Sequence, residues 1–212
     1  MPDVAAKPPR LRADAHRNRE RIITAARELF VVFGAEVPLD EIAKRAGVGN
    51  ATLYRHFADR RELIRQVSLS VMDRVIGHAI AAAEEEPDAF AALSRFTHAA
   101  ADERIGALCP LLSEHIDADD PELEAAKVRL EQATTDLVSR AHTSGQLRPD
   151  VGVGDFVVAI TQLTRPLPGA ACVAVDEFTH RHLQILLDGL RAPAPSVLPG
   201  RSATLADLRR PA

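Results

Sequence analysis

The 212-residue chain has no tryptophan, one tyrosine and two cysteines, Cys109 and Cys172, which lie far apart. Two distant cysteines supply no disulfide framework, and residues 1–16 are polar and contain prolines, without the apolar segment of a secretory signal. A reduced, cytoplasmic protein is therefore expected. Apolar runs are short and interrupted by charge, which argues against a membrane span. No run of alternating β-branched residues indicates a sheet, so the sequence predicts an all-α fold.

Charge is distributed unevenly along the chain. Residues 1–65 carry a net charge of +4 and residues 66–212 carry −8. A basic part joined to an acidic part is typical of a polyanion-binding module attached to a second domain, and the length permits one domain or two. The same asymmetry also arises by chance in soluble proteins, so the charge alone leaves both interpretations open.

A helix-turn-helix pattern follows a proline at position 38. That proline opens a helix over about 38–46, and Gly47 permits a tight turn because glycine adopts a positive φ. In the next helix Leu53 and Phe57 lie four residues apart and form the face expected to be buried. The polar and basic residues of that helix point the other way, and such a face suits the major groove of DNA.

These residues resemble the TetR family of bacterial repressors. Thr52–Phe57 is similar to the recognition helix of that family, Ile22–Gly34 to its first helix and Leu39–Ala43 to the start of its second. Two weaker patterns, Gly145–Asp150 and Leu187–Arg191, resemble members with SbtR-like effector domains. The resemblance implies a one-component transcriptional regulator, most often a repressor. It would bind a palindromic double-stranded DNA operator as a homodimer and be released by a small-molecule effector.

Composition and resemblance together predict four segments. They are a disordered basic arm over 1–16, a three-helix helix-turn-helix DNA-binding domain over 17–62, a helical effector-binding and dimerisation domain over 63–191, and a disordered proline-containing tail over 192–212. The arm could equally be inert or touch DNA. A fourth helix from Asp59 to about residue 83 links the two domains. Further helices are expected at about 88–104, 106–117, 121–144, 151–165 and 175–191.

The candidate DNA-contacting residues lie on or beside the outward face of the recognition helix: Lys44, Gly49, Asn50, Ala51, Thr52, Tyr54, Arg55, His56 and Arg60. Thr52 and Arg55 can donate to base edges, and arginine is the usual partner of guanine. By analogy with the family, Tyr54 and His56 contact phosphates, while Lys44 and Arg60 add positive charge. Each residue alone could be an ordinary solvated side chain. Their combination around the only tyrosine of the chain favours the functional interpretation.

A candidate effector pocket in the second domain is lined by Leu93, Phe96, Cys109, Leu112, His115 and Ile116. Ligand pockets are mostly apolar with a few polar groups, although ordinary core packing explains the same residues equally well. Broad apolar faces also occur on two later helices, and the resemblance places these faces in a two-fold dimer interface. The first face comprises Phe156, Val157, Ile160 and Leu163, and the second comprises Phe178, Ile185, Leu186 and Leu190.

No catalytic residue, metal site or cofactor is expected. His180 and His182 are two residues apart and point to nearly opposite sides of a helix, whereas paired metal ligands on helices are four apart. Cys109 with His115 lacks a recognisable oxyanion motif, and Gly152-Val153-Gly154 lacks the further glycine and preceding strand of a phosphate loop. The rival functions are an enzyme or small-molecule carrier with a vestigial helix-turn-helix, and a DNA-binding protein that responds to another protein.

Overall fold

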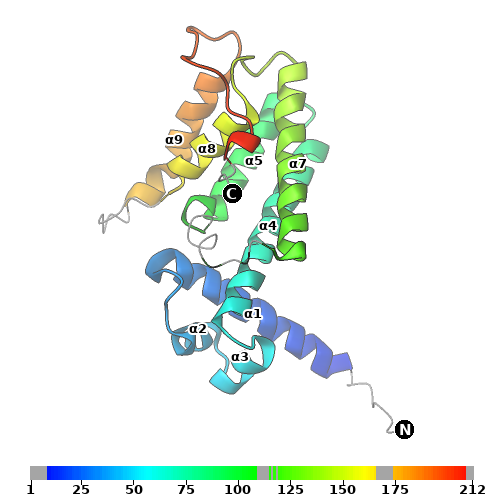
Figure 1. Ribbon diagram of the computed structural model, residues 1–212, viewed down its shortest axis with the longest axis vertical. Coiled ribbons are helices and arrows are strands. Elements are labelled where there is room, and N and C mark those ends of the chain that lie inside the picture. Colours follow the sequence, from blue (N-terminus) through cyan, green and yellow to red (C-terminus); the bar gives the residue numbers. More distant parts are fainter. Residues whose placement is uncertain (1–8, 109–114, 116, 118, 166–173, 209–212) are drawn as a thin grey trace. The chain divides into compact units, whose positions relative to one another are not determined.

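The computed structural model describes residues 9–108, 115, 117, 119–165 and 174–208 (Figure 1). Their elements are α1 (Pro9–Phe33), α2 (Leu39–Ala46), α3 (Asn50–His56), α4 (Arg60–Glu85), α5 (Ala89–Asp102), α7 (Pro121–Thr143), α8 (Val153–Leu163), α9 (Ala174–Leu190) and the 3-10 turn η1 (Ala206–Leu208). The described residues contain no strand, only an isolated bridge between Leu147 and Arg191. The predicted all-α fold is confirmed.

The described residues form two compact units, and the chain passes from the first to the second inside α4, between Ser70 and Val71. Residues 115 and 117 belong to the first unit. We call these the N-terminal unit and the C-terminal unit. The division falls later than the predicted boundary at 62/63, because the buried side chains at the start of α4 belong to the N-terminal unit.

The N-terminal unit is a small helical core with an apolar stripe from each helix. Ile22, Ala26 and Phe30 repeat at intervals of four along α1, so they lie on one face, and all three are buried. They share the core with Ile42 of α2 and Leu53 of α3. Because α1 begins at Pro9, residues 9–16 are helical, whereas the sequence predicted a disordered arm over 1–16. The rest of that arm lies outside the described residues.

In the C-terminal unit α5 packs against α7 and α9, and α8 packs against α7 and α9 (Figure 1). The Asp88 and Asp120 carboxylates accept hydrogen bonds from the first-turn N–H groups of α5 and α7, so each helix begins at an N-terminal cap. Helical residues at 105–108 begin the helix expected over 106–117, and most of the remainder of that range lies outside the described residues.

The two segments that resemble SbtR-like domains meet at Arg148. This arginine is buried, and its guanidinium donates to the Asp150 carboxylate over 2.7 and 2.9 Å and to the Ser196 carbonyl over 2.7 Å. The hydrogen bonds from Arg148 hold the pKa of Asp150 well below its usual range. The backbone N–H of Arg148 also donates to the carbonyl of Leu190, 3.0 Å away. The junction therefore fastens the loop after α7 to the end of α9.

Residues 192–208, which we call the C-terminal segment, are ordered, whereas the sequence predicted a disordered tail over 192–212. The N–H of Ala192 donates to the carbonyl of Gln146 over 2.9 Å, and the N–H of Leu198 donates to the Asp150 carboxylate over 3.1 Å. Farther along, Ala203 exchanges hydrogen bonds with the start of α8. The composition suggested disorder because it does not reveal hydrogen-bond partners. The backbone groups of this segment bond to residues that are distant in sequence. Residues 209–212 lie outside the described residues.

Candidate nucleic-acid interface

The turn before α3 depends on Gly47, which has φ +64°. The N–H of Gly47 donates to the carbonyl of Lys44 over 3.1 Å, and the N–H of Val48 donates to that of Ala43 over 3.0 Å, so the end of α2 is capped. The Arg21 guanidinium in turn donates to the Gly47 carbonyl over 3.2 Å. A Cβ at this position would lie 2.5 Å from Nη2 of Arg21. The positive φ therefore favours glycine at this turn.

Helix α3 is anchored by one face and exposes the other. Leu53 and Phe57 are buried, and the Arg19 guanidinium lies 5.8 Å from the centre of the Phe57 ring. Tyr54 and Arg55 are exposed, as is Ala51 at the start of the helix. The predicted orientation of the buried face is confirmed. Thr52 and His56 are half-buried at the edges of the exposed face.

Polar residues around α3 have intramolecular partners. Arg55 folds along its own helix, where Nε donates to the Ala51 carbonyl over 3.0 Å and Nη2 donates to Oγ1 of Thr52 over 3.1 Å. Nδ2 of Asn50 donates to the Asp40 carboxylate over 2.8 Å. Lys44 is well exposed, and its Nζ lies 3.7 Å from the Glu41 carboxylate. Such exposed contacts contribute little to stability.

Two of the predicted DNA-contacting residues have different surroundings. Gly49 is the N-cap of α3 and makes no side-chain cap hydrogen bond. The half-buried Arg60 donates to the carbonyls of Ala35 and Val37, the latter over 2.7 Å. Arg60 thus fastens the connection between α1 and α2, and its role as a flanking positive charge stays a prediction.

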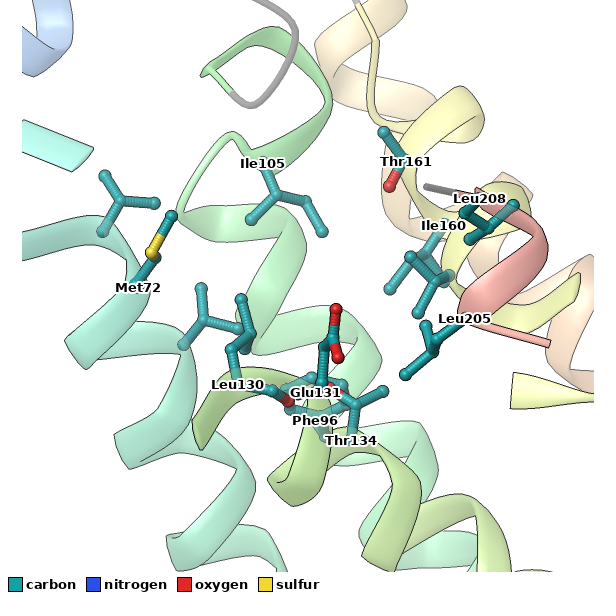
Figure 2. A pocket seen from close by; sticks show the side chains of 13 residues that line it. Met72, Phe96, Ile105, Leu130, Glu131, Thr134, Ile160, Thr161, Leu205 and Leu208 are labelled. Atoms are coloured by element: carbon teal, nitrogen blue, oxygen red, sulfur yellow. Dashed lines mark hydrogen bonds between the residues drawn. The ribbon is translucent and has the colours of Figure 1, made fainter. Parts of the chain in front are cut away.

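The C-terminal unit contains a cavity of about 270 Å³ (Figure 2). Its lining comes from α4, α5, α7, α8, the turn after α5 and the C-terminal segment: Val71, Met72, Val75, Phe96, Ile105, Leu130, Glu131, Thr134, Val157, Ile160, Thr161, Leu205 and Leu208. Ten of these thirteen residues are apolar, which is typical of a small-molecule site.

The predicted effector pocket coincides with this cavity at Phe96 alone among its described residues. Leu93 is buried elsewhere in the core. His115 belongs to the N-terminal unit, where its Nε2 lies 3.5 Å from the Glu36 carboxylate. The other three predicted residues, Cys109, Leu112 and Ile116, lie outside the described residues. One feature of the sequence could have indicated this cavity. Thr134 is a polar residue within the apolar stripe of α7, one turn after Glu131.

Sequence reasoning also missed a pair of histidines. Nδ1 of His98 on α5 lies 2.9 Å from Nδ1 of His180 on α9, and Nε2 of His180 lies 3.0 Å from the Asp102 carboxylate. His98 lies 82 positions from His180 along the chain, and residues that far apart give no periodic signal in the sequence. In the part of the chain that the structure describes, no three histidine, cysteine, aspartate or glutamate residues are grouped to hold a metal ion.

The apolar faces predicted for the dimer interface need correction. Phe156 and Ile160 on α8 and Leu190 on α9 are buried within the unit, so they cannot meet a partner subunit. The large apolar side chains that α8 and α9 expose are instead Val158 (41% exposed), Phe178 (47%) and Ile185 (61%). Both helices are apolar on more than one side, and the packing of the unit selects which side is covered.

Comparison with known proteins identifies two parts of the chain. Residues 22–67 match the family described as bacterial regulatory proteins, tetR family. Residues 88–192 match the family described as transcriptional regulator SbtR-like, C-terminal domain. An HTH-type transcriptional regulator of Staphylococcus aureus is 42% identical over 69 residues, which is 32% of this chain and 37% of that protein. The chain therefore aligns with only about a third of this relative's length.

Solved structures resemble the chain over most of its length. A TetR transcription regulatory protein from Mycobacterium vanbaalenii is 30% identical, with a TM-score of 0.61, and the match covers 86% of this chain and 99% of that one. A TetR transcriptional regulator from Streptomyces coelicolor is 26% identical, with a TM-score of 0.64, over 83% of this chain and 99% of that one. These relatives are transcriptional regulators rather than enzymes.

The protein is thus a member of the TetR family of transcriptional regulators. Its N-terminal part is the helix-turn-helix domain of that family, and its C-terminal part is of the SbtR-like type. The resemblance inferred from the recognition-helix residues is confirmed. Among the residues that the structure describes, no helix combines the length and the apolar character needed to cross a membrane.

Proposed function

We propose that the protein is a homodimeric repressor that binds a palindromic operator through α3 and releases it when a small molecule fills the cavity. The observation that carries the proposal is the exposed face of α3, where Tyr54 and Arg55 stand beside Thr52 on a helix fixed by the Gly47 turn. A short helix presented this way enters the major groove in helix-turn-helix proteins, and a two-fold dimer binds two half-sites.

The roles of the α3 side chains follow from their chemistry. The Arg55 guanidinium can donate two hydrogen bonds to guanine, so it is the best candidate for recognising a base. The Tyr54 hydroxyl and His56 suit phosphate oxygens, while Lys44 supplies positive charge at the flank. Base contacts determine which sequence is bound, whereas phosphate contacts position the protein.

Release requires a ligand that prefers the arrangement unable to bind DNA, with about 1.4 kcal/mol of preference for each tenfold loss in affinity. Helix α4 can transmit a change at the cavity to the DNA-binding domain, because it belongs to both units. Its start contributes Leu63 and Val67 to the core of the N-terminal unit, and its middle contributes Val71, Met72 and Val75 to the cavity. A ligand that shifts the middle of α4 would therefore act on a helix whose first turns are part of the N-terminal unit.

Substitutions at Lys44 and Tyr54 test the phosphate contacts. Each cationic contact to a phosphate contributes a slope of roughly −0.9 to log K against log salt, because counterions are released. Lys44→Ala should weaken specific and random DNA alike and make the slope shallower by about one. Tyr54→Phe should weaken both and leave the slope unchanged, because a neutral hydroxyl releases no counterion. Anisotropy of a labelled duplex between about 0.05 and 0.2 M salt measures both effects.

Lys127→Ala is the matched control. Lys127 lies in the C-terminal unit, and its Nζ is 3.5 Å from the Glu124 carboxylate. Its removal should leave affinity and slope unchanged. A slope that is the same in Lys44→Ala and in the wild type would contradict the interface, as would an equally large change of slope in Lys127→Ala.

A further inference from the structure

The lining of the cavity in the C-terminal unit gives little support to a charged ligand. Among the described residues that line it there is no lysine, arginine or histidine, so an anionic ligand would lose hydration without gaining a cationic partner. Glu131 is the one acidic residue among them. It is half-exposed, so water competes for its carboxylate, and ion pairs at exposed sites contribute little. The lining therefore favours an uncharged ligand.

The volume of the cavity limits the size of that ligand. About 270 Å³ admits about nine non-hydrogen atoms, since one water occupies roughly 30 Å³ in the liquid. The buried Thr134 donates its hydroxyl proton within α7, where Oγ1 lies 2.9 Å from the Leu130 carbonyl, and a hydroxyl oxygen can also accept a hydrogen bond. The space therefore suits a hydrocarbon with one small polar group.

One side of the cavity is supplied by the C-terminal segment, through Leu205 and Leu208 (Figure 2). This segment docks on the start of α8. There the N–H of Gly154 donates to the Ala203 carbonyl over 3.0 Å, and the N–H of Ala203 donates to the Asp155 carboxylate over 3.1 Å. Two hydrogen bonds thus hold the backbone shortly before Leu205.

Gly152 and Gly154 make this docking possible. A Cβ on Gly154 would lie 2.6 Å from the Thr204 carbonyl oxygen, and a Cβ on Gly152 would collide with the Ala203 carbonyl. The close approach of the segment to α8 therefore requires glycine at both positions. This contact explains a glycine pair for which the sequence suggested no phosphate-binding role.

A local ion pair shapes the end of the segment. The Arg201 guanidinium donates to the Asp207 carboxylate over 2.7 and 2.8 Å, and the N–H of Thr204 donates to the same carboxylate over 2.8 Å. These bonds hold η1, the turn that places Leu205 and Leu208 against the cavity. This side of the cavity is therefore a folded turn with its own hydrogen bonds.

We propose that the cavity binds a small uncharged apolar molecule, and that Leu205 and Leu208 of the C-terminal segment set the length of the hydrocarbon that it accepts. The proposal rests on the proposed function only for the effect of such a ligand on DNA, because binding to the cavity is measured separately. The two leucines are then specificity-determining residues, since each occupies space that a longer ligand would need.

Calorimetric titration of the full chain at about pH 7 with octan-1-ol, octanoate and octylammonium tests the ligand class. The three probes have similar hydrocarbon chains and differ in the head group. Octan-1-ol should bind at least about tenfold more tightly than either charged probe, because a charged head group must give up hydration.

Thr161→Lys tests whether the probes bind in this cavity. Thr161 belongs to the lining and is half-exposed, so the variant adds a cation to the lining without burying it completely. Octanoate should then bind at least as tightly as octan-1-ol. The matched variant Gln162→Lys changes the next residue of α8, which is exposed and outside the lining, and it should keep the wild-type order.

The role of the C-terminal segment is tested with hexan-1-ol, octan-1-ol and decan-1-ol. In the wild type the affinity should rise about fourfold for each CH₂ group up to octan-1-ol and then level off, because the cavity is full. In the double variant Leu205→Ala and Leu208→Ala the rise should continue to decan-1-ol. Leu208→Ala alone, at a position that is 41% exposed, should show a smaller shift in the same direction. Leu198→Ala, in the same segment outside the lining, is the matched control and should keep the wild-type dependence on length.

The proposal is overturned if a charged probe binds the wild type as tightly as octan-1-ol, if no alcohol binds, or if Thr161→Lys leaves the order of the probes unchanged. It is also overturned if both leucine variants keep the wild-type dependence on length. DNA binding by the ligand-free chain is measured in parallel. Alcohol binding without sequence-specific DNA binding would remove the proposed function and keep the ligand class, whereas the reverse result would remove the ligand class alone.

Discussion

Ile185→Glu is expected to convert the protein into a folded monomer that no longer holds its operator. Ile185 is 61% exposed on α9, and Val158 and Phe178 are the other large apolar side chains that the described residues of α8 and α9 expose. If the exposed apolar side chains of α8 and α9 form the dimer interface, as we propose, a glutamate at this position would bring like charges together there. Loss of the second half-site removes the gain from joint binding, which is worth about 10²–10⁴ in affinity. Sedimentation and duplex titration measure the two effects.

Ile80→Glu provides the matched control. Ile80 lies on α4 and is 50% exposed, so the same substitution is made at a similar exposure away from α8 and α9. This variant should remain dimeric and bind the operator as the wild type does. If Ile185→Glu stays dimeric at micromolar concentration, the interface lies on another surface. The same substitution at Ile160, which the sequence placed on the interface face, would damage the interior of the unit, where that side chain is buried.

Arg55→Ala is expected to weaken binding to the operator by about 1–3 kcal/mol and to leave random DNA much less affected. In the free protein Arg55 is exposed, and its guanidinium donates to Ala51 and Thr52 of its own helix. Exchanging these contacts for a guanine costs little, whereas alanine leaves the base without its partner. Competition between operator and random duplexes measures the ratio of the two affinities.

Arg45→Ala is the matched arginine control. Nε and Nη2 of Arg45 donate to the same Glu28 carboxylate oxygen over 2.8 and 2.7 Å, so this exposed guanidinium is already neutralised within the protein. Its loss should not change the ratio of operator to random affinity. An equal loss on both kinds of DNA in Arg55→Ala would make Arg55 a phosphate contact and leave base recognition to Asn50, Ala51 and Thr52.

The N-terminal unit was predictable because its determinants are local. The spacing of Ile22, Ala26 and Phe30 defines one helix face, and Gly47 marks the turn by its conformational freedom. Leu53 indicates which side of α3 is buried, so the exposed side follows directly. Arg60 could not be placed in the same way, because its bonds to the Ala35 and Val37 carbonyls depend on how α4 packs.

The cavity and the C-terminal segment were not predictable, since both depend on contacts between residues far apart in the chain. In the sequence Glu131 resembles a solvated helix residue. The structure shows that it lines the same cavity as Ile160 and Leu205. The proline-containing composition after residue 191 favoured disorder, and contacts with distant residues, such as that of Ala203 with Gly154, reverse that expectation. Periodicity indicates which residues a helix can bury, but it does not identify their neighbours.

We propose above all that the exposed face of α3 recognises a DNA sequence as part of a dimer. Selection of bound duplexes from a random library by the full chain, at about 0.15 M salt, tests this claim most directly. We predict enrichment of a palindrome bound by two protomers, with an affinity at least about 10³-fold above that for random DNA. Recovery of unrelated sequences bound no more tightly than random duplexes would contradict it.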